Sequence, residues 1–403
     1  MIQIFRHNPL FLRFWIATIA SQLASRMHSL ILIWIIYKWT GSALYVGLAM
    51  VAASLPAVLI APYSGSIVDR KNKVSIMMKA DFTRMLLVLV FAWMFYANML
   101  NEQWLVGGTV FISLASAFFN PASYAVLPTL VHEDEITQAN AIGQISGSAS
   151  SILGPLFGST LIATMGVTKA FIGAGILFFI SVLFLFNIKD LTQKVGKATA
   201  SVFEDMKSGF RLVRQFAIVH KMLLIMAIVN FFYSSLTIVI PILAKADVKE
   251  ISYLMSAIGA GMLSSSLLLS GIKLKIKPGN SMALTFLFIG LAFISAAYST
   301  ALLPLILEMF IIGFMLNMFN ITLIAIYQIR LPRASLGRIM SLIIAVSLSL
   351  QPLSYGIIGA VVGYFDVKNT LLLSGIVILL SAVGVYRVKE LNEEKTPTET
   401  DDG

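Results

Sequence analysis

Long apolar segments occupy most of this chain and constrain its fold more than any other feature. A helix that crosses a lipid bilayer needs roughly 20 apolar residues. Short polar turns separate most of the segments, and the strict alternation of a membrane β-barrel strand is absent. The sequence therefore predicts an all-α membrane protein with 12 transmembrane helices. The expected spans are 14–37, 43–68, 75–97, 104–128, 138–165, 168–188, 218–244, 250–272, 281–300, 302–329, 338–365 and 367–388.

Composition excludes several other classes of protein. Of the 403 residues, 58% are hydrophobic and 12% are charged, whereas soluble domains have about 25% charged residues. A soluble enzyme and a disordered protein are therefore excluded. The chain contains no cysteine, which excludes disulfide bonds, thiol catalysis and cysteine-bound metals.

The positions of the basic residues predict the orientation in the membrane. Of the 29 Lys and Arg residues, 22 fall at the termini and in the loops of one face, 5 fall in the opposite loops, and Arg26 and Arg84 lie within spans. Lysine and arginine collect on the cytoplasmic side of membrane proteins. We therefore expect both termini in the cytoplasm, and we interpret the net charge of +10 as a signal of orientation and not of nucleic-acid binding.

One longer polar stretch divides the chain into two six-helix halves. We expect the halves at 1–188 and 218–388, a cytoplasmic linker at 189–217 and a disordered cytoplasmic tail at 389–403. Apolar residues at helical spacing between basic residues predict that the linker is an amphipathic helix on the membrane surface. A plain charged connection is the alternative. Two repeated halves are typical of secondary transporters.

The loop after the second span carries a specific pattern. It reads Gly65-Ser-Ile-Val-Asp69-Arg70-Lys71-Asn72-Lys73 and resembles the signature loop of the major facilitator superfamily, Gly-x-x-x-Asp-Arg-x-x-Arg/Lys. The resemblance implies a cytoplasmic gating loop that latches the two halves together, formed by Gly65, Asp69, Arg70 and Lys73. Asp69 would then face the start of the eleventh span, and we expect Gly65 to allow a close approach of helices. An ordinary basic loop is the alternative interpretation.

A second pattern lies in the fifth span. The segment Gly154-Pro155-Leu-Phe-Gly158 resembles the Gly-Pro-x-x-Gly motif of exporters in the same superfamily. Proline removes a backbone donor and kinks the helix, while glycines leave grooves for a neighbouring span. A kinked helix without a functional role is the alternative. Further fragments of the first half, such as Asn120-Pro121-Ala122, are similar to the macrolide-efflux-like branch, which implies a drug:proton antiporter with the major facilitator fold.

Polar residues inside spans are candidates for function, because ionisable side chains are costly at membrane depth. Gln22 and Arg26 belong to a polar stripe on the first span that we expect to face a watery cavity. The resemblance places the first, fourth, seventh and tenth spans around that cavity. We therefore expect a substrate or proton pathway formed by Arg26, Gln22, Asn120, Asn230, Glu308, Asn317 and Asn320. Simple hydrogen bonding between helices is the alternative for the amides.

The acidic residues inside the spans receive different expected roles. Asp81 and Arg84 lie three residues apart on one helix face, so we expect them to form an intramembrane ion pair, with a proton site as the alternative. Glu308 has no basic residue near it in the sequence. It is the preferred candidate for proton coupling, or for pairing with Arg26 across the cavity.

Together these patterns predict a secondary active transporter in a bacterial cell membrane. We expect proton-coupled efflux of small amphipathic compounds, drug-like or macrolide-like, by alternating access. A siderophore or lipid exporter and a solute importer of the same fold are the alternatives. We expect no enzymatic activity, since the chain has no phosphate-binding loop and no His-Glu-x-x-His metal motif. The proton gradient is the expected energy source, with no other cofactor and no metal. The expected partners of the monomer are a small molecule, protons and the bilayer, without nucleic acid.

Overall fold

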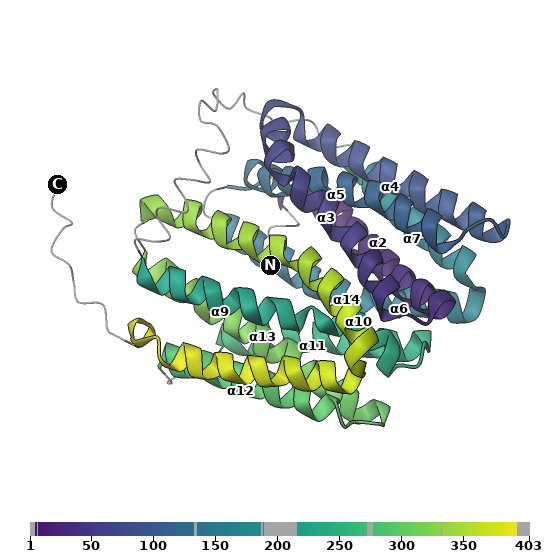
Figure 1. The fold of residues 1–403 in the computed structure, drawn as a ribbon. Coiled ribbons are helices and arrows are strands. Elements are labelled where there is room, and N and C mark those ends of the chain that lie inside the picture. The colour runs from purple at the N-terminus through teal and green to yellow at the C-terminus, as the bar shows by residue number, and fades with distance from the viewer. Residues whose placement is uncertain are drawn as a thin grey trace. The chain divides into compact units, whose positions relative to one another are not determined.

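The computed structural model describes residues 5, 7–132, 135–186, 188, 216–271, 277–331 and 333–392, and all regular elements in these ranges are helices (Figure 1). Almost all of the predicted linker 189–217 and the tail beyond Asn392 lie outside the described residues. The predictions made for those two segments therefore stay predictions.

Six long helices form from the first half of the chain. Asparagine caps start three of them: Phe11, Ser75 and Trp104 donate their backbone N–H groups to the side chains of Asn8, Asn72 and Asn101. The helices are α2 (Pro9–Thr40), α3 (Ala43–Arg70), α4 (Lys73–Tyr96), α5 (Glu102–Leu130), α6 (Ile136–Met165) and α7 (Val167–Phe186). Their bounds agree with the first six expected spans to within a few residues.

The helices of the second half include two interruptions. The elements are α9 (Ala217–Tyr233), α10 (Ser235–Leu243), α11 (Val248–Gly271), α12 (Pro278–Ala296), α13 (Leu302–Arg330), α14 (Arg333–Tyr386) and the short 3-10 helix η2 (Lys389–Leu391). The seventh expected span is divided at Ser234 into α9 and α10, which the sequence did not predict. The long α14 is broken at Asp366, whose φ of 65° is not helical, at the position where the eleventh and twelfth spans were expected to separate.

The number of helices that can cross a membrane agrees with the predicted 12. By length and apolar composition, 10 stretches of the described chain qualify, and the stretch Ser349–Tyr386 contains the break at Asp366 and therefore supplies two spans. The remaining span is α4. This helix is less apolar than the others, because Lys79, Asp81 and Arg84 lie in its interior. Any stretch of 18 residues within α4 contains all three charged side chains. The prediction of an all-α protein with 12 spans is confirmed.

The chain forms two compact units that do not follow the two halves. The first unit contains Met1–Thr199, Ser234–Ala260 and Gln351–Val367, and the second contains Ala200–Tyr233, Gly261–Leu350 and Lys368–Gly403. In the first unit, α2 packs against α6 and α7, α4 packs against α5 and α7, and α10 packs against α2 and α3. In the second unit, α12 packs against α13. The first unit thus includes parts of three spans of the second half, namely α10, the first part of α11 and a middle part of α14.

Close contacts hold those helix ends within the first unit. A β-carbon on Gly47 of α3 would lie 2.5 Å from the carbonyl oxygen of Tyr355 and 3.0 Å from the Cα of Gly359, both in α14. Hydrogen bonds join Trp34 Nε1 to the Ala246 carbonyl at 2.9 Å and Ser159 Oγ to Ser252 Oγ at 2.8 Å. The charge distribution of the sequence predicts that these ends lie on the outer side of the membrane. We call the set the outer contact cluster, and its members are Trp34, Gly47, Ile152, Ser159, Ala246, Ser252, Ser256, Tyr355 and Gly359.

Polar contacts join α9, η2 and the start of α12 within the second unit. Lys221 of α9 donates to the carboxylate of Glu390 in η2, and this contact lowers the pKa of Glu390 below its usual value. The Asn392 side chain accepts a hydrogen bond from the Gly279 N–H at 2.9 Å, which caps the start of α12. These contacts fix the end of the described chain against α9 and α12.

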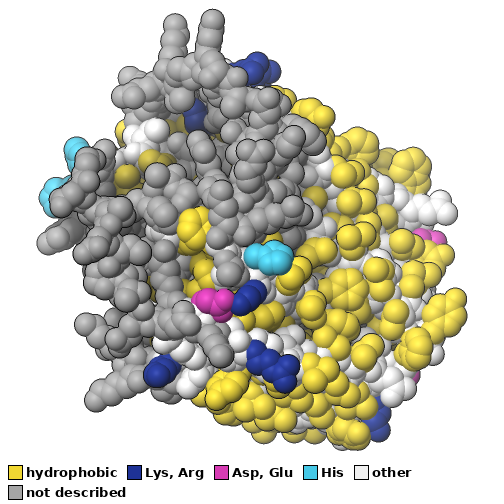
Figure 2. Space-filling view, turned by 60° about the vertical axis from the view of Figure 1, so that its left-hand side comes forward, with side chains coloured by type: hydrophobic (Ala, Val, Ile, Leu, Met, Phe, Trp, Pro, Cys, Tyr) yellow, Lys and Arg dark blue, Asp and Glu magenta, His cyan; other side chains and the backbone are white. Residues whose placement is uncertain are grey.

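The surface of the described chain is largely apolar, as a lipid-facing surface must be. Figure 2 shows hydrophobic side chains, in yellow, gathered over a broad part of one face. Exposed apolar side chains include Leu59, Trp93, Phe111, Phe186 and Leu303. A soluble monomer rarely exposes a contiguous apolar patch of more than a few hundred Å². This surface therefore agrees with insertion in a bilayer.

Candidate substrate cavity

A cavity of about 460 Å³ lies inside the first unit, between α2, α4, α5 and α6. Drug-sized ligands bind in cavities of about 300–1,000 Å³. Three predicted pathway residues, Gln22, Arg26 and Asn120, are in its wall. The described lining consists of Phe11, Phe14, Trp15, Thr18, Ser21, Gln22, Ser25, Arg26, Ser29, Arg84, Ser116, Phe119, Asn120, Ser123, Tyr124, Leu127, Ala139, Asn140, Gly143, Gln144 and Gly147.

The polar part of this wall comes from stripes on three helices. On α2 the stripe runs from Thr18 through Gln22 and Arg26, at the helical spacing of three to four residues. A second stripe on α5 contains Ser116, Asn120 and Ser123, and a third on α6 contains Asn140 and Gln144. The predicted substrate or proton pathway did not include Asn140 and Gln144. Their four-residue spacing is the signal that could have identified them.

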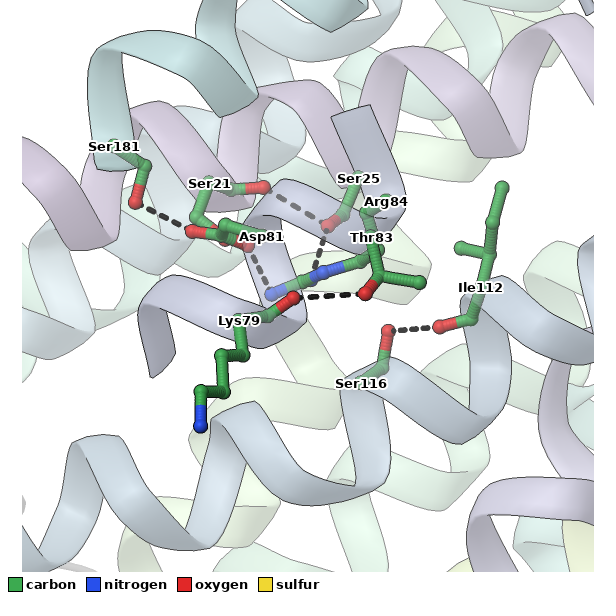
Figure 3. Close-up of polar contacts among 9 residues, drawn as sticks. All are labelled: Ser21, Ser25, Lys79, Asp81, Thr83, Arg84, Ile112, Ser116 and Ser181. Carbon is green, nitrogen blue, oxygen red and sulfur yellow. Dashed lines mark hydrogen bonds and ion pairs between the residues drawn. The ribbon is translucent and has the colours of Figure 1, made fainter. Parts of the chain in front are cut away.

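Asp81 and Arg84 form a buried ion pair at the edge of the cavity (Figure 3). Arg84 contributes to the cavity wall, whereas Asp81 lies behind it and is fully buried. Ser181 Oγ donates to Asp81 Oδ2 at 2.5 Å and Ser21 Oγ donates to Oδ1 at 3.1 Å. The carboxylate is thus held by two serine hydroxyls as well as by Arg84, which is how a buried ion pair is stabilised. Figure 3 shows the Lys79 side chain pointing away from the pair.

Aromatic rings and a serine hold the guanidinium of Arg84 in place. Its central carbon lies 4.5 Å from the ring centre of Phe119 and 5.0 Å from that of Phe178. Arg84 Nη1 also donates to Ser25 Oγ at 3.4 Å. Cations are attracted to the faces of aromatic rings. Arg84 therefore links the cavity wall to the buried Asp81 through a fixed geometry.

The glycines of the fifth-span pattern form a groove on α6 that receives α2. A β-carbon on Gly154 would lie 2.4 Å from the Cβ of Arg26, and a β-carbon on Gly158 would lie 3.0 Å from Leu30 Cδ2. The two glycines are four residues apart and so lie on one face of the helix. Gly154 therefore lets α6 pack directly behind Arg26.

Gly154→Ala is expected to disturb this packing. The added methyl group would collide with the first side-chain carbon of Arg26, which cannot swing away as the end of a flexible side chain can. Overpacking of this kind costs about 1–3 kcal/mol of unfolding free energy. The matched control is Gly107→Ala in α5, where a β-carbon would meet no described atom within 4 Å. Denaturant titration of both purified variants checks the prediction, and equal stabilities would contradict it.

The gating-loop residues are described only in part. Arg70 is exposed at the end of α3 and Lys73 is buried at the start of α4. A β-carbon on Gly65 would meet no described atom within 4 Å, so the close helix approach expected there stays a prediction. The side chain of Asp69 and the start of the eleventh span, its predicted partner, lie outside the described side chains.

The four remaining pathway residues lie in the second unit and outside the described cavity lining. Asn317 Nδ2 donates to the Met262 carbonyl and to Ser266 Oγ, both at 2.8 Å, and so joins α13 to α11. Asn230 and Asn320 are partly buried on α9 and α13. Asn317 thus makes the helix-to-helix hydrogen bonds of the alternative interpretation.

Glu308 is buried against the neighbouring helix. Its Oε1 accepts hydrogen bonds from Ser295 Oγ at 2.5 Å and from Ser299 Oγ at 2.6 Å. Both serines lie at the end of α12 or just after it. Because Glu308 and Arg26 belong to different units, their pairing stays a prediction. Within the described residues, no group of three His, Asp or Glu side chains could hold a metal ion.

Twelve apolar spans and a polar cavity enclosed by helices define a membrane transporter. The chain belongs to the transmembrane secretion effector family of the major facilitator superfamily, whose sequence profile matches residues 4–401. The resemblance of the chain to the major facilitator superfamily is thereby confirmed. A small-molecule substrate and a lipid bilayer are the partners that a transporter of this family requires.

Known relatives and structures agree with this assignment. Over 408 aligned residues the chain is 24% identical to macrolide efflux protein A of Streptococcus pyogenes, covering 95% of this chain and 96% of the relative. It is 28% identical over 238 residues to YfiS, an uncharacterised MFS-type transporter of Bacillus subtilis (strain 168), and this match spans 56% of this chain and 55% of that relative. The fold is also that of a POT family transporter solved in complex with 5-aminolevulinic acid, with a TM-score of 0.76, 11% identity and coverage of 96% of this chain and 97% of that one.

Proposed function

We propose that this protein is a proton-coupled exporter of small amphipathic compounds that works by alternating access in a bacterial cell membrane. Both termini lie in the cytoplasm, and the protein acts as a monomer. The observation that carries the proposal is the polar cavity whose wall residue Arg84 is paired with a buried carboxylate, Asp81. A transporter needs a substrate site and a group that takes up a proton, and here the two adjoin.

Asp81 supports proton coupling through its position. It contacts two residues of the cavity wall, Ser21 and Arg84. A proton on Asp81 removes the charge that holds Arg84, so the wall changes when the proton binds. A ligand shifts a conformational equilibrium only by binding the two states differently. Glu308 lacks this link to the described cavity wall, and we therefore assign proton coupling to Asp81 in place of Glu308.

The direction of transport rests on the fifth-span pattern and on a relative. The Gly154–Gly158 groove belongs to the motif that resembles exporters, and a relative that matches 95% of the chain is named a macrolide efflux protein. The outer contact cluster supplies one of the two seals that alternating access requires. A siderophore or lipid exporter has the same direction and differs only in the substrate, whereas an importer reverses it.

Reconstituted protein tests the coupling. We expect an imposed pH gradient to speed the flux of dansyl-labelled amphiphiles into proteoliposomes about tenfold, which corresponds to about 1.4 kcal/mol. Asp81→Asn should lose this acceleration and keep gradient-free exchange of the same probe, because asparagine resembles the protonated carboxyl group, cannot titrate, and leaves the residues of the wall in place. Glu308→Gln and the exposed control Lys79→Gln should keep both.

Two outcomes would contradict the proposal. Wild-type flux that ignores the gradient for a labelled macrolide and for the dansyl probes alike removes proton coupling. Loss of the acceleration in Glu308→Gln with retention in Asp81→Asn returns the role to Glu308. Flux is normalised to folded protein measured by size-exclusion chromatography, so that a poorly folding variant is not scored as uncoupled.

A further inference from the structure

A groove of about 470 Å³ runs between α12 and the second part of α14 on the surface of the second unit. The two helices lie side by side in Figure 1, with that part of α14 in yellow. The wall is apolar except for one amide and one phenol, and it consists of Asn280, Ala283, Leu284, Leu287, Ala382, Val383 and Tyr386. The proposed transport cycle does not use this groove, which belongs to a different unit from the polar cavity.

Two glycines bring α12 and α14 into backbone contact near one end of the groove. A β-carbon on Gly290 would lie 2.8 Å from the carbonyl oxygen of Gly375, and one on Gly375 would lie 2.9 Å from the carbonyl oxygen of Gly290. Asn280 precedes Gly290 by ten residues, which is about 15 Å along the helix axis. The helices therefore enclose the groove over about half of the roughly 30 Å hydrocarbon core, the depth of one lipid leaflet.

Two exposed basic residues lie at the other end of the groove. Lys277 immediately precedes α12 and comes one turn before the lining residue Asn280. Arg387 comes one turn after the lining residue Val383, and its backbone N–H donates to the Val383 carbonyl at 3.2 Å, which continues the helical turn. Both side chains are exposed. A positive site thus adjoins an apolar groove.

The acidic residue nearest to this site in the sequence is engaged elsewhere. Glu390 follows Arg387 by three residues, but its carboxylate accepts from Lys221 of α9. No described acidic side chain pairs with Lys277 or with Arg387. The positive charge at the end of the groove is therefore not neutralised by the described residues, and it is complementary to an anion.

From this arrangement we propose that the groove binds one anionic phospholipid, with an acyl chain between α12 and α14 and the phosphate group at Lys277 and Arg387. Basic pockets between spans on the cytoplasmic side bind anionic headgroups, and the sequence predicts that this end faces the cytoplasm. Tyr386 is 65% exposed at the same end, and tyrosine is enriched at the level of the headgroups. An acyl chain in the groove gains contacts with two helices, which a flat helix face does not offer.

A fluorescent label beside the groove tests the inference. The natural chain has no cysteine, so Phe288→Cys provides one site for bimane at an exposed position next to the lining residue Leu287. The labelled protein is placed in nanodiscs of phosphatidylcholine with increasing fractions of dibrominated phosphatidylglycerol or dibrominated phosphatidylcholine, which quench bimane on contact. We expect half-quenching at an about tenfold lower fraction of the anionic lipid, because two basic residues attract its headgroup.

A second label separates the groove from the general lipid-facing surface. Ile176→Cys places bimane on an exposed face of α7, ten residues from the helix end, as Phe288 is on α12. At this position both brominated lipids should quench equally. Equal preference for the anionic lipid at the two labels would overturn the inference, because the attraction would then belong to the whole surface.

Paired substitutions test the two basic residues. Lys277→Gln with Arg387→Gln should bring the phosphatidylglycerol curve of the groove label onto the phosphatidylcholine curve. The control pair, Lys79→Gln with Lys249→Gln, removes two exposed charges from the first unit and should change nothing. Exchange of the two basic residues, Lys277→Arg with Arg387→Lys, keeps both charges and should keep the preference, which answers the objection that the glutamine pair has misfolded.

A groove-filling substitution tests the place of the acyl chain. Ala283→Phe leaves both basic residues unchanged and occupies the groove between the helices. We expect it to remove the preference at the groove label, because the acyl chain no longer fits beside the label. Retention of the preference in folded Ala283→Phe would overturn the assignment of the groove.

Three further outcomes would overturn the inference. The first is equal quenching of the groove label by the two lipids, or an unchanged preference in the folded glutamine pair. The second is displacement of brominated phosphatidylglycerol by glycerol phosphate, which has no acyl chain and would reveal a site for free phosphate. The third is a preference that appears only when the acidic residues 393–403 are deleted, which would identify this segment as the occupant.

Discussion

Asp81→Asn alone is expected to destabilise the protein by about 3–5 kcal/mol, the cost of leaving one partner of a buried ion pair uncompensated. Asp81 is fully buried and Arg84 is 2% exposed. The asparagine preserves the shape of the side chain and can still accept from Ser21. It removes the charge that balances the guanidinium. The free energy of unfolding is measured by denaturant titration of the protein in mixed micelles.

The double variant Asp81→Leu with Arg84→Met is expected to recover most of that loss. Apolar residues of similar volume often replace a buried ion pair without a net cost, because both desolvation penalties disappear together. The matched single-charge control is Lys79→Gln on the same helix, which is exposed and should change stability by less than about 0.5 kcal/mol. A double variant less stable than Asp81→Asn would show that the pair itself holds α4, α2 and α7 together.

Gly359→Val is expected to open the outer contact cluster and to block the transport cycle. A β-carbon at this position would lie 3.0 Å from the Cα of Gly47 and 3.1 Å from the carbonyl oxygen of Ala43. Both are backbone atoms, so α3 and α14 must separate to make room. Overpacking costs about 1–3 kcal/mol, which lowers the closed population by about 5- to 150-fold.

Labelling of a single cysteine measures this opening directly. The natural chain has no cysteine, so Ser252→Cys introduces a unique thiol at a fully buried position of the cluster. We expect a membrane-impermeant maleimide to label it slowly in the otherwise wild-type protein and quickly when Gly359→Val is added. Gly363→Val lies one turn further on α14, where a β-carbon would meet no described atom within 4 Å. Equal labelling of the two valine variants would contradict the role of Gly359.

Much of the fold depends on local features of the sequence and was therefore predictable. Span limits depend on the length of apolar segments and on caps such as Asn72 and Asn101, and both are visible in the sequence. The break at Asp366 followed from a polar turn between two apolar segments. The division of α9 from α10 at Ser234 was not predictable, because α10 packs against α2 and α3 of the other half.

The site was predictable where a helix shows its own polar stripe. Arg26 and Gln22 were found on α2 because their spacing marks one face, whereas Asn140 and Gln144 were overlooked in a segment interpreted only as the start of a span. Glu308 appeared isolated in the sequence, yet Ser295 and Ser299 from the preceding helix satisfy it. Which helix lies opposite a carboxylate depends on tertiary packing, and a single sequence does not contain that information in readable form.

The polar content of α4 also has a consequence for how the protein is made. Each charged residue at the centre of an isolated helix costs roughly 2.5–3.5 kcal/mol on insertion, and α4 carries Asp81 and Arg84 in its interior. One of the groups that shelter Asp81 is Ser181, which follows it by 100 residues and lies on α7. The groups that surround Asp81 are therefore complete only after the sixth span has been synthesised, and the order of chain growth becomes part of how the cavity is assembled.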